Sequence, residues 1–508
     1  MKRIACFALV LLLGLAAAFA FASELPADGQ YTIAVRLSGG SGRASVQSPA
    51  VMTVQNGAAT ATLVWSSSNY TYMRIGDTQY DAVTIQPGST FEIPVTPDEE
   101  ISFVAQTTAM GTPHEIAYTL FFDSSTVAPF TEETIDAVEA AAVPDAAASS
   151  EEEDTAWRSQ AQELGNGWEA EMETELVYAR HFAMYTYPDG YQLIALSNGS
   201  RFLIIPEGHA IPEGLDSDIV TLYRPVGNIY LAATSAASLF DAIGALDCVT
   251  LSGTKEEGWY NAGIRAAMED GRILYAGKYS APDYELILAS GCSLAVESLM
   301  INHAPKVAEK LQEFGIPVLI DLSSLEPHPL GRTEWMKLYA ALTGTQAEAD
   351  RVFAEQMACV EEMTGSSGKT VVFFYINTSG NAVVRKSGDY IAKMIELAGG
   401  QYIFENLGDS TTATASITLE MEQFYAGAKD ADVLIYNSTI GGEIQGLAEL
   451  LQKNALLADF KAVKTGDVWC TRQNMYQETT RLGSIIADMR KVLTGGDPSD
   501  ITYLFKLD

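Results

Sequence analysis

One short stretch of the sequence gathers residue types that bind anions or metal ions. Glu326, His328, Arg332 and Glu334 lie close together, beside an expected strand end. In a cleft, the Arg332 guanidinium could hold a carboxylate or phosphate through two hydrogen bonds, and His328 could meet a metal ion. The alternative is a loop locked by Arg–Glu pairs, with Trp335 filling the core. We favour binding for Arg332 and His328, and a structural role for Glu334 and Trp335.

Aromatic and basic residues farther along the chain are candidates for the opposite wall of such a cleft. Tyr375 and Tyr436 end apolar segments, and Arg385 begins a positive pair that is rare in an acidic chain. This set suits a flat aromatic ligand or a chelated anion, whereas packing at the end of a sheet is the common alternative for the tyrosines. The expected cleft residues are Glu297, Glu326, His328, Arg332, Tyr375, Arg385, Tyr436, Trp469 and Tyr476.

A histidine and a tyrosine stand four residues apart in the first quarter of the chain. On a β-strand, His114 and Tyr118 would share one face, roughly 13 Å apart. From these residues alone, the favoured interpretation is an aromatic strand face buried in a β-domain core.

Motifs of catalysis are absent from the sequence. It contains no Gly-x-Ser-x-Gly, no phosphate-binding loop and no His-Glu-x-x-His. The five histidines are scattered and no two cysteines stand at metal-ligand spacing, so a zinc site is not expected. We therefore expect a protein that is not an enzyme and holds no catalytic cofactor.

The charge balance excludes one large class of partners. Lys and Arg number 31 against 65 Asp and Glu, which gives a formal net charge of −34. Such a chain repels phosphate backbones, so we expect no nucleic-acid binding. With 47% hydrophobic residues it can still bury a sizeable core. An anionic ligand would need a local positive pocket.

The first residues predict export. Lys2 and Arg3 precede an apolar run that ends in small residues, so 1–22 is predicted to be a secretory signal peptide, with an uncleaved anchor as the alternative. Cys6 lacks the context of a lipoprotein cleavage site. No later stretch is long and apolar enough to span a bilayer. The expected location is extracellular or in the cell envelope.

Patterns of hydrophobicity divide the rest into five parts. Short alternating strands separated by Gly and Pro predict an immunoglobulin-like β-sandwich at 24–125. An acidic, alanine-rich linker follows at 126–170. Strand–helix repeats then predict two α/β lobes, 171–344 and 365–508, joined by a long helix at 345–364. Because ligands of open α/β sheets sit beyond the carboxyl ends of strands, two facing lobes would form one cleft. The expected strands are 228–232, 293–298, 317–321, 370–377 and 432–437.

The segment between about 200 and 495 resembles the helical-backbone class of substrate-binding proteins of ABC importers. The resemblance rests on the order of blocks and on the strings at 283–296, 310–318 and 326–335. It implies capture of haem, a siderophore, a corrinoid or another chelated metal. It also implies that Glu285 and one of Glu420 or Glu422, taken here as Glu422, contact arginines of a permease, whereas a solvated carboxylate is the common alternative for a surface glutamate. We expect a monomer.

The segment from about 28 to 123 resembles a NEAT-type haem-binding domain. Ser67, Ser68, Tyr70 and Met73 would form its lip, and 114–118 its late strand, with His114 where the family has its first tyrosine. The resemblance implies a haem site there, with His114 as the iron ligand and Met110 and Tyr118 beside it.

Together these features favour an exported protein that captures haem or another iron chelate as cargo for an ABC importer. One alternative is a surface interaction or adhesion protein whose β-domain binds protein or glycan. Another alternative keeps the importer but changes the cargo to a corrinoid or a siderophore.

Overall fold

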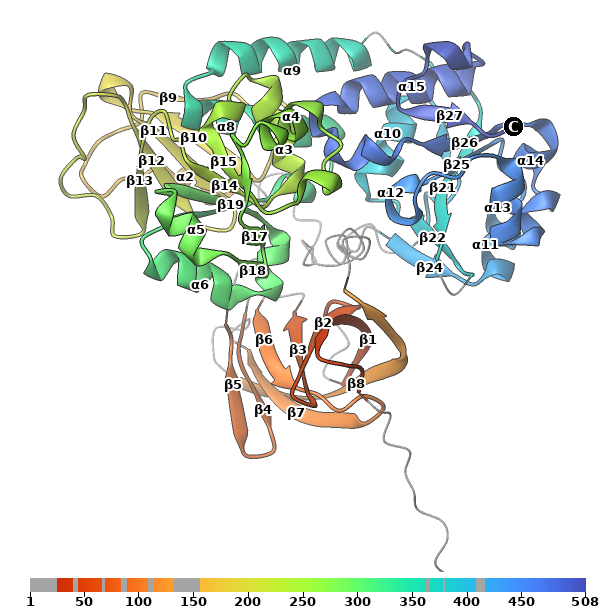
Figure 1. Cartoon of the computed structure of the whole chain (residues 1–508), viewed down its shortest axis with the longest axis horizontal. Coiled ribbons are helices and arrows are strands. Elements are labelled where there is room, and N and C mark those ends of the chain that lie inside the picture. Colours follow the sequence, from red (N-terminus) through yellow and green to blue (C-terminus); the bar gives the residue numbers. More distant parts are fainter. Residues whose placement is uncertain are drawn as a thin grey trace, which may run out of the picture.

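A computed structural model describes residues 25–39, 44–65, 69–83, 89–107, 114–130, 156–361, 363, 365–377, 380–407 and 416–508. It contains a β-domain and two α/β lobes (Figure 1). The predicted signal peptide and the central part of the predicted linker lie outside these residues.

The β-domain is built from one continuous antiparallel sheet. Its strand order is β5-β4-β7-β8-β1-β2-β3-β6, and the end strands β5 and β6 approach each other, so the sheet curls on itself. This differs from the predicted two-sheet sandwich because β1 and β8 are long enough to cross both layers, with an irregularity between Thr32 and Ala34. The strands are β1 (Gly29–Gly39), β2 (Ala50–Gln55), β3 (Ala58–Val64), β4 (Tyr70–Ile75), β5 (Thr78–Asp81), β6 (Thr90–Pro94), β7 (Glu100–Thr107) and β8 (His114–Pro129).

The outer face of this sheet is packed against the first lobe. Thr32, Val51, Thr62 and Glu92 are register partners across β1, β2, β3 and β6, so they form one row on the face that turns away from the β-domain core. Val51 is 1% exposed and belongs to a buried cluster of the first lobe. The β-domain is therefore docked, not merely tethered.

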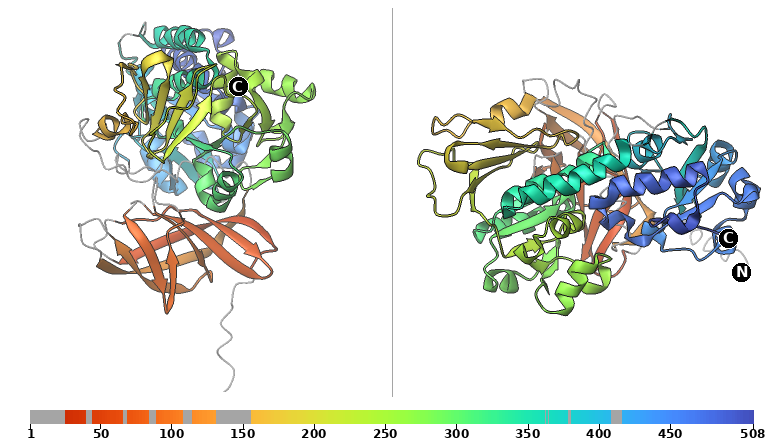
Figure 2. Two further views of the ribbon diagram at one scale, coloured as in Figure 1. Left: turned by 90° about the vertical axis from the view of Figure 1, so that its left-hand side faces the viewer. Right: turned by 90° about the horizontal axis from the view of Figure 1, so that it is seen from above.

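Polar contacts surround this docking row. The Thr62 hydroxyl donates to the carbonyl of His303 (3.4 Å), and Lys306 forms an ion pair with Glu92. Phe130, at the end of the β-domain, packs edge-on against Tyr279, with 6.5 Å between ring centroids. Figure 2 shows the docked β-domain below the lobes, on the side away from α9 (Gln346–Glu361).

Lobe 1 holds two sheets. The first is β13-β12-β11-β10-β9, in which all neighbours except β12 and β13 are antiparallel, so strand–helix alternation begins later than predicted. The second is the parallel sheet β16-β15-β14-β19-β20. The strands are β9 (Met172–Glu173), β10 (Phe182–Thr186), β11 (Gln192–Leu196), β12 (Arg201–Ile205), β13 (Ile219–Tyr223), β14 (Ile229–Leu231), β15 (Val249–Ser252), β16 (Leu274–Tyr275), β19 (Leu294–Ser298) and β20 (Val318–Asp321), with a β17–β18 hairpin at Gly277–Lys278 and Ala281–Pro282.

Lobe 2 is one mixed sheet in the order β24-β22-β21-β25-β26-β27, with β23 also paired to β21. Its central strands β21, β25 and β26 are parallel and apolar on both faces, as a sheet covered by helices requires. The five predicted α/β strands are present as β14, β19, β20, β21 and β25. The strands of this lobe are β21 (Thr370–Ile376), β22 (Ala382–Arg385), β23 (Gln401–Tyr402), β24 (Ser416–Leu419), β25 (Val433–Tyr436), β26 (Val468–Thr471) and β27 (Leu504–Lys506).

The interlobe helix is present as α9, which packs along α15 (Leu482–Thr494) of lobe 2 (Figure 2, right). Its buried face carries Ala349, Val352 and Phe353 at helical spacing. The other helices are α2 (Ala156–Ala161), α3 (Thr234–Ala242), α4 (Ala262–Glu269), α5 (Tyr284–Ala289), α6 (Pro305–Glu313), α7 (Pro329–Glu334), α8 (Met336–Thr343), α10 (Tyr390–Leu397), α11 (Met421–Ala428), α12 (Ser438–Gly441), α13 (Leu447–Lys453) and α14 (Lys461–Thr465).

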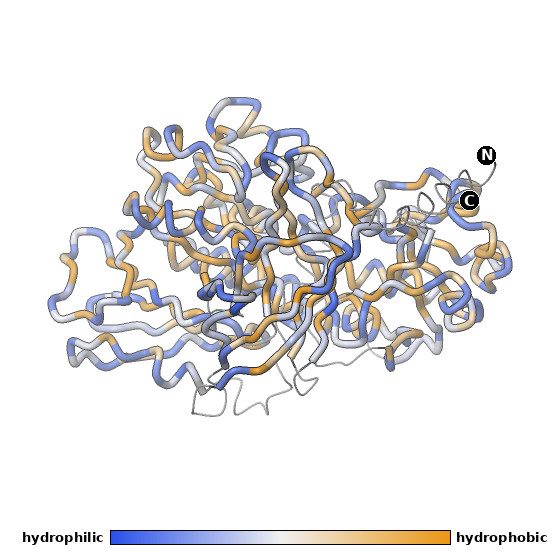
Figure 3. The backbone as a smooth tube through the Cα atoms, turned by 90° about the horizontal axis from the view of Figure 1, so that it is seen from below, coloured by the Kyte–Doolittle hydropathy of each residue, from blue (hydrophilic) through white to orange (hydrophobic). Residues whose placement is uncertain are grey.

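Hydrophobic and hydrophilic residues are interleaved along the described chain (Figure 3). Among the described residues, no helix combines the length and the apolar character needed to cross a membrane.

Candidate functional site

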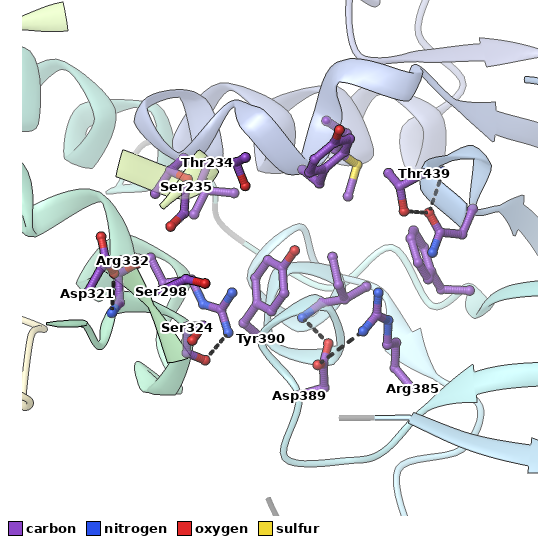
Figure 4. A pocket seen from close by; sticks show the side chains of 18 residues that line it. Thr234, Ser235, Ser298, Asp321, Ser324, Arg332, Arg385, Asp389, Tyr390 and Thr439 are labelled. Carbon is purple, nitrogen blue, oxygen red and sulfur yellow. Dashed lines mark hydrogen bonds and ion pairs between the residues drawn. The ribbon is translucent and has the colours of Figure 1, made fainter. Parts of the chain in front are cut away.

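The candidate site is a pocket between the two lobes, with a cavity volume of about 120 Å³. Figure 4 shows side chains from both lobes pointing into it. Lobe 1 contributes Thr234, Ser235, Ser298, Asp321, Ser323, Ser324 and Arg332, and lobe 2 contributes Phe373, Arg385, Asp389, Tyr390, Ile391, Asn437, Thr439, Met475, Tyr476, Thr479 and Leu482.

The carboxyl ends of parallel strands position most of these residues. Thr234 and Ser235 follow β14, Ser298 ends β19, Asp321 ends β20, and Asn437 follows β25. In open α/β sheets this edge is where ligands bind, because helices begin there and turn their N–H groups outward. The architecture of both lobes therefore builds one shared pocket.

Two guanidinium groups face the pocket from opposite lobes. Arg332 in α7 donates from Nη2 to the Ser324 carbonyl (2.6 Å) and from Nε to the Glu326 carbonyl (3.3 Å). Its guanidinium carbon lies 3.6 Å from the ring centroid of Tyr390, which belongs to lobe 2. This cation–π contact joins the lobes across the pocket.

The second guanidinium belongs to Arg385, at the end of β22. Its Nη1 lies 3.8 Å from a carboxylate oxygen of Asp389 and 3.4 Å from the Ser416 hydroxyl. The Arg385 side chain is 14% exposed. A positive charge that is largely withdrawn from water gains more from an anionic ligand than an exposed one does.

Two buried carboxyl groups also line the pocket. Asp321 accepts hydrogen bonds from the Ser323 N–H (2.7 Å) and the Tyr339 hydroxyl (2.5 Å), and Asp389 caps α10 by accepting from the Ile391 N–H (2.9 Å). Burial raises the pKa of both carboxyl groups, against the opposing effect of these hydrogen bonds and of the nearby arginines. Both side chains thus serve local structure and leave the arginines as the cationic groups of the pocket.

Three of the predicted cleft residues line this pocket: Arg332, Arg385 and Tyr476. Glu297 and Tyr436 do not, because each precedes a pocket residue by one position on a strand and alternation turns it to the opposite face. Glu297 is fully buried, and burial raises the pKa of its carboxyl well above the ordinary value. In each case the next residue along the chain, Ser298 or Asn437, lines the pocket instead.

Two other predicted cleft residues have structural partners instead. The Glu326 carboxylate accepts from the backbone N–H groups of Arg180 and His181 and from the Trp335 indole (2.8, 3.0 and 2.9 Å). His328 caps α7, since its Nδ1 accepts from the Leu330 N–H (3.2 Å). Its ring stacks on Tyr178, and burial lowers the pKa of the imidazole to about 4. These contacts hold the loop that presents Arg332.

Tyr375 and Trp469 also lie away from the pocket lining. Trp469 is 4% exposed and belongs to the hydrophobic core of lobe 2, and Tyr375 packs against that core. Phe373, two positions earlier on the same face of β21, lines the pocket instead. Packing at the sheet, the alternative considered for such aromatic residues, accounts for both positions.

The β-domain candidates fall into three groups. Tyr70, Met73 and Tyr118 are buried in the β-domain core, where the two tyrosine hydroxyls are 2.8 Å apart and both rings pack against Trp65. This corrects their prediction as a haem-facing surface, because the inward face of β4 and β8 is the core. His114 is partly exposed at the start of β8. Ser67, Ser68 and Met110 lie outside the described residues.

The two glutamates predicted to meet a permease are exposed. Glu285 lies in the first turn of α5 in lobe 1, and Glu422 lies in the first turn of α11 in lobe 2. Neither carboxylate forms a hydrogen bond or an ion pair with another described residue. Among the described residues, no group of three His, Cys, Asp or Glu side chains is placed to hold a metal ion.

The sequence prediction missed the hydroxyl groups of the pocket. Thr234, Ser235, Ser298, Ser323 and Thr439 all lie at or just beyond strand ends that were predicted. The topological rule for α/β sheets carries this signal, and applying it to the residues immediately after each strand would have found them.

Comparison with known proteins yields relatives of part of the chain. An uncharacterized lipoprotein of Methanocaldococcus jannaschii is 27% identical over 322 residues, which cover 60% of this chain and 74% of that protein. A second uncharacterized lipoprotein of the same organism is 27% identical over 350 residues, covering 65% and 86%.

Solved structures with a similar arrangement include a periplasmic haem-binding protein of Vibrio cholerae (16% identity, TM-score 0.43, covering 51% of this chain and 97% of that one). A periplasmic binding protein of Veillonella parvula has 17% identity and a TM-score of 0.44, covering 56% and 97%. Residues 235–475, which include most of the pocket residues of both lobes, match the family model described as periplasmic binding protein.

Proposed function

We propose that this protein is an exported substrate-binding protein that captures a small ligand, of the iron-chelate class, for an ABC importer. The observation that carries the proposal is the pocket formed jointly by both lobes, with Arg332 on one side and Arg385 on the other. A ligand held by residues of both lobes stabilises one arrangement of the lobes, which a partner that contacts both lobes can recognise. The family match over 235–475 supports the same role.

Delivery of the ligand requires a surface that the permease of the importer can recognise. Glu285 and Glu422 place one exposed carboxylate on each lobe, so a partner with two suitably spaced arginines would contact both at once. Such contacts guide association more than they add affinity. The docking role of these two glutamates is part of the proposal.

The test of delivery separates docking from ligand capture. Glu285→Arg and Glu422→Arg should abolish ligand uptake by cells or vesicles that contain the importer, while ligand affinity of the purified protein stays unchanged. Glu269→Arg, an exposed charge reversal at the end of α4, is the matched control and should transport normally. Normal uptake by the double variant would contradict the docking assignment.

Capture of haem by the β-domain remains a prediction that rests on His114. Incubation of the full-length protein with haemin, followed by desalting, should leave a Soret band that His114→Ala removes. A band that persists unchanged in this variant would exclude His114 as the ligand. If the wild-type protein shows no band, the strand face of β8 serves the β-domain core alone.

A further inference from the structure

The chemistry of the pocket lining restricts the cargo more than the proposed function does. The lining contains the hydroxyl groups of Thr234, Ser235, Ser298, Ser323, Ser324, Thr439 and Thr479 and the amide of Asn437. Its large apolar members are few: Phe373, Ile391, Met475 and Leu482. Pockets for drug-sized ligands are mostly apolar, so a hydroxyl-rich lining points to a ligand whose own surface is rich in oxygen.

The size of the cavity points in the same direction. Its volume of about 120 Å³ is well below the roughly 300–1,000 Å³ of pockets that enclose drug-sized molecules. A flat macrocycle would need the lobes to part and the Arg332–Tyr390 contact to break, whereas a compact ligand fits between the walls as they stand.

The positively charged groups of the pocket also favour an anionic ligand. Arg332 uses Nε and Nη2 for backbone carbonyls and stacks on Tyr390, and its Nη1 has no hydrogen bond to any described residue. Thr234 and Ser235 form the first turn of α3, whose N-cap residue, Ala233, offers no side-chain acceptor. The pocket therefore presents two guanidinium groups, of which that of Arg385 already lies beside Asp389, and a helix N-terminus whose first N–H groups lack a side-chain cap, inside a chain of net charge −34.

We infer that the cargo is a compact oxyanion: either a hydroxycarboxylate, free or as its ferric complex, or an inorganic oxyanion. Arg332 and Arg385 each supply charge-assisted hydrogen bonds to its oxygen atoms, and the Ser and Thr hydroxyls satisfy the remaining ones. This inference rests on the proposed function, because it specifies the cargo of the same pocket.

Titration calorimetry of the full-length protein tests the inference with defined probes. Citrate, ferric citrate, phosphate and sulfate are the oxyanion arms, and haemin and cyanocobalamin are the macrocycle arms. We expect at least one oxyanion to bind, and the arm that binds distinguishes an organic from an inorganic cargo. Arg332→Gln and Arg385→Gln should each weaken that binding roughly tenfold to a hundredfold.

The matched control is Arg351→Gln, which removes an exposed arginine of α9 that pairs with Glu348. It should bind like the wild type. Circular dichroism of each variant shows whether it is folded, and Arg385→Lys, which keeps the charge but loses the planar fork, should give an intermediate affinity.

Three outcomes overturn the inference in distinguishable ways. Binding of haemin or cyanocobalamin without any oxyanion binding overturns the cargo class and leaves the proposed function standing. Oxyanion binding that is unchanged in folded Arg332→Gln and Arg385→Gln proteins places the ligand elsewhere. Failure of every probe to bind counts against both the inference and the proposed function.

Discussion

Single side chains in this protein hold the binding loop in place without touching the pocket. Glu326 is fully buried, and its two carboxylate oxygens accept three hydrogen bonds. Glu326→Ala would leave the buried Trp335 indole N–H and two partly buried backbone N–H groups without this acceptor, and a buried donor left unpaired costs about 1–3 kcal/mol. We expect the free energy of unfolding of the lobes to fall by about 1–3 kcal/mol, measured by urea denaturation with tryptophan fluorescence. Glu326→Gln keeps one oxygen acceptor and should lose less; a Glu326→Ala protein as stable as the wild type would refute this role.

The paired tyrosine hydroxyls in the β-domain allow a double-mutant cycle. Tyr70 and Tyr118 are buried and their hydroxyls are 2.8 Å apart. Tyr118→Phe leaves the Tyr70 hydroxyl without this partner, so it should lower the unfolding free energy of the β-domain by about 1–2 kcal/mol. The double variant Tyr70→Phe/Tyr118→Phe leaves neither hydroxyl without its partner, so it should be more stable than the sum of the two single effects predicts. Strict additivity would show that the two hydroxyls do not interact.

For single residues, the sequence predicted the strand ends that reach the candidate pocket but only some of the side chains that line it. Arg332, Arg385 and Tyr476 stood out by charge or aromatic character, whereas Ser298 and Asn437 lay one position beyond the chosen Glu297 and Tyr436. On a strand, one position reverses the direction of a side chain, so an error of one residue exchanges pocket for core. The polarity of two neighbouring residues alone could not show which of them faces the pocket.

Among the elements, α9 and α15 set the angle between the lobes. Gly483 in α15 lies so close to α9 that an added Cβ would be 2.3 Å from the Gln356 carbonyl oxygen, and the Ser484 N–H donates to the Gln356 side chain (3.1 Å). Gly483→Ala must push the helices apart, so we expect a less stable protein and a changed lobe angle. Thermal unfolding and small-angle X-ray scattering measure the two effects. Gly495→Ala, at an open helix end where positive φ makes the cost local, is the comparison and should leave the lobe angle unchanged.

The same pair of helices predicts limited closure. Lobe 2 also contacts lobe 1 through Gln477, which accepts from the Tyr260 N–H and donates to the Gly258 carbonyl (both 2.8 Å), and through the Thr333–Thr479 hydrogen bond (2.8 Å). A continuous helix and these bridges resist hinge bending. Small-angle scattering should therefore show little compaction when ligand is added; a large compaction would contradict this rigidity.

Docking of the β-domain should weaken in acid. His303 is the last residue of η4 (Leu299–His303) in lobe 1, its Nε2 lies 3.3 Å from Nε2 of Gln47 in the β-domain, and burial lowers the pKa of its imidazole from 6.5 to about 4. Because the docked state favours neutral histidine, its contribution is complete above about pH 6.5 and is lost as the pH falls toward 4, by up to about tenfold in the docking constant per pH unit. The charged pair at this interface, Glu92 and Lys306, flanks the same contact.

Small-angle scattering of the full-length protein between pH 7.5 and pH 4.5 measures this release as an increase in maximum dimension. His303→Gln keeps a hydrogen-bonding side chain that does not titrate in this range, so it should reduce the pH dependence. An acid-induced expansion of equal size in the variant would assign the effect to other groups.

For the molecule as a whole, the sequence predicted three folded parts and a long helix but not how they meet. The short alternating strands predicted for the β-domain gave no sign that their second face is covered, yet lobe 1 buries part of it. Threonine, valine and glutamate on that face are equally suited to water and to a polar interface, so composition could not distinguish the two. The sequence alone therefore could not predict that the β-domain docks on lobe 1.

The central claim is that the pocket between the lobes holds a small anionic cargo through Arg332 and Arg385. Native mass spectrometry of the full-length protein tests it most directly, with ferric citrate, phosphate or haemin supplied before desalting. We predict that wild-type protein retains one small anion and that the double variant Arg332→Gln/Arg385→Gln, folded by circular dichroism, retains none. Equal retention by wild type and double variant, or retention of haemin alone, would contradict the claim.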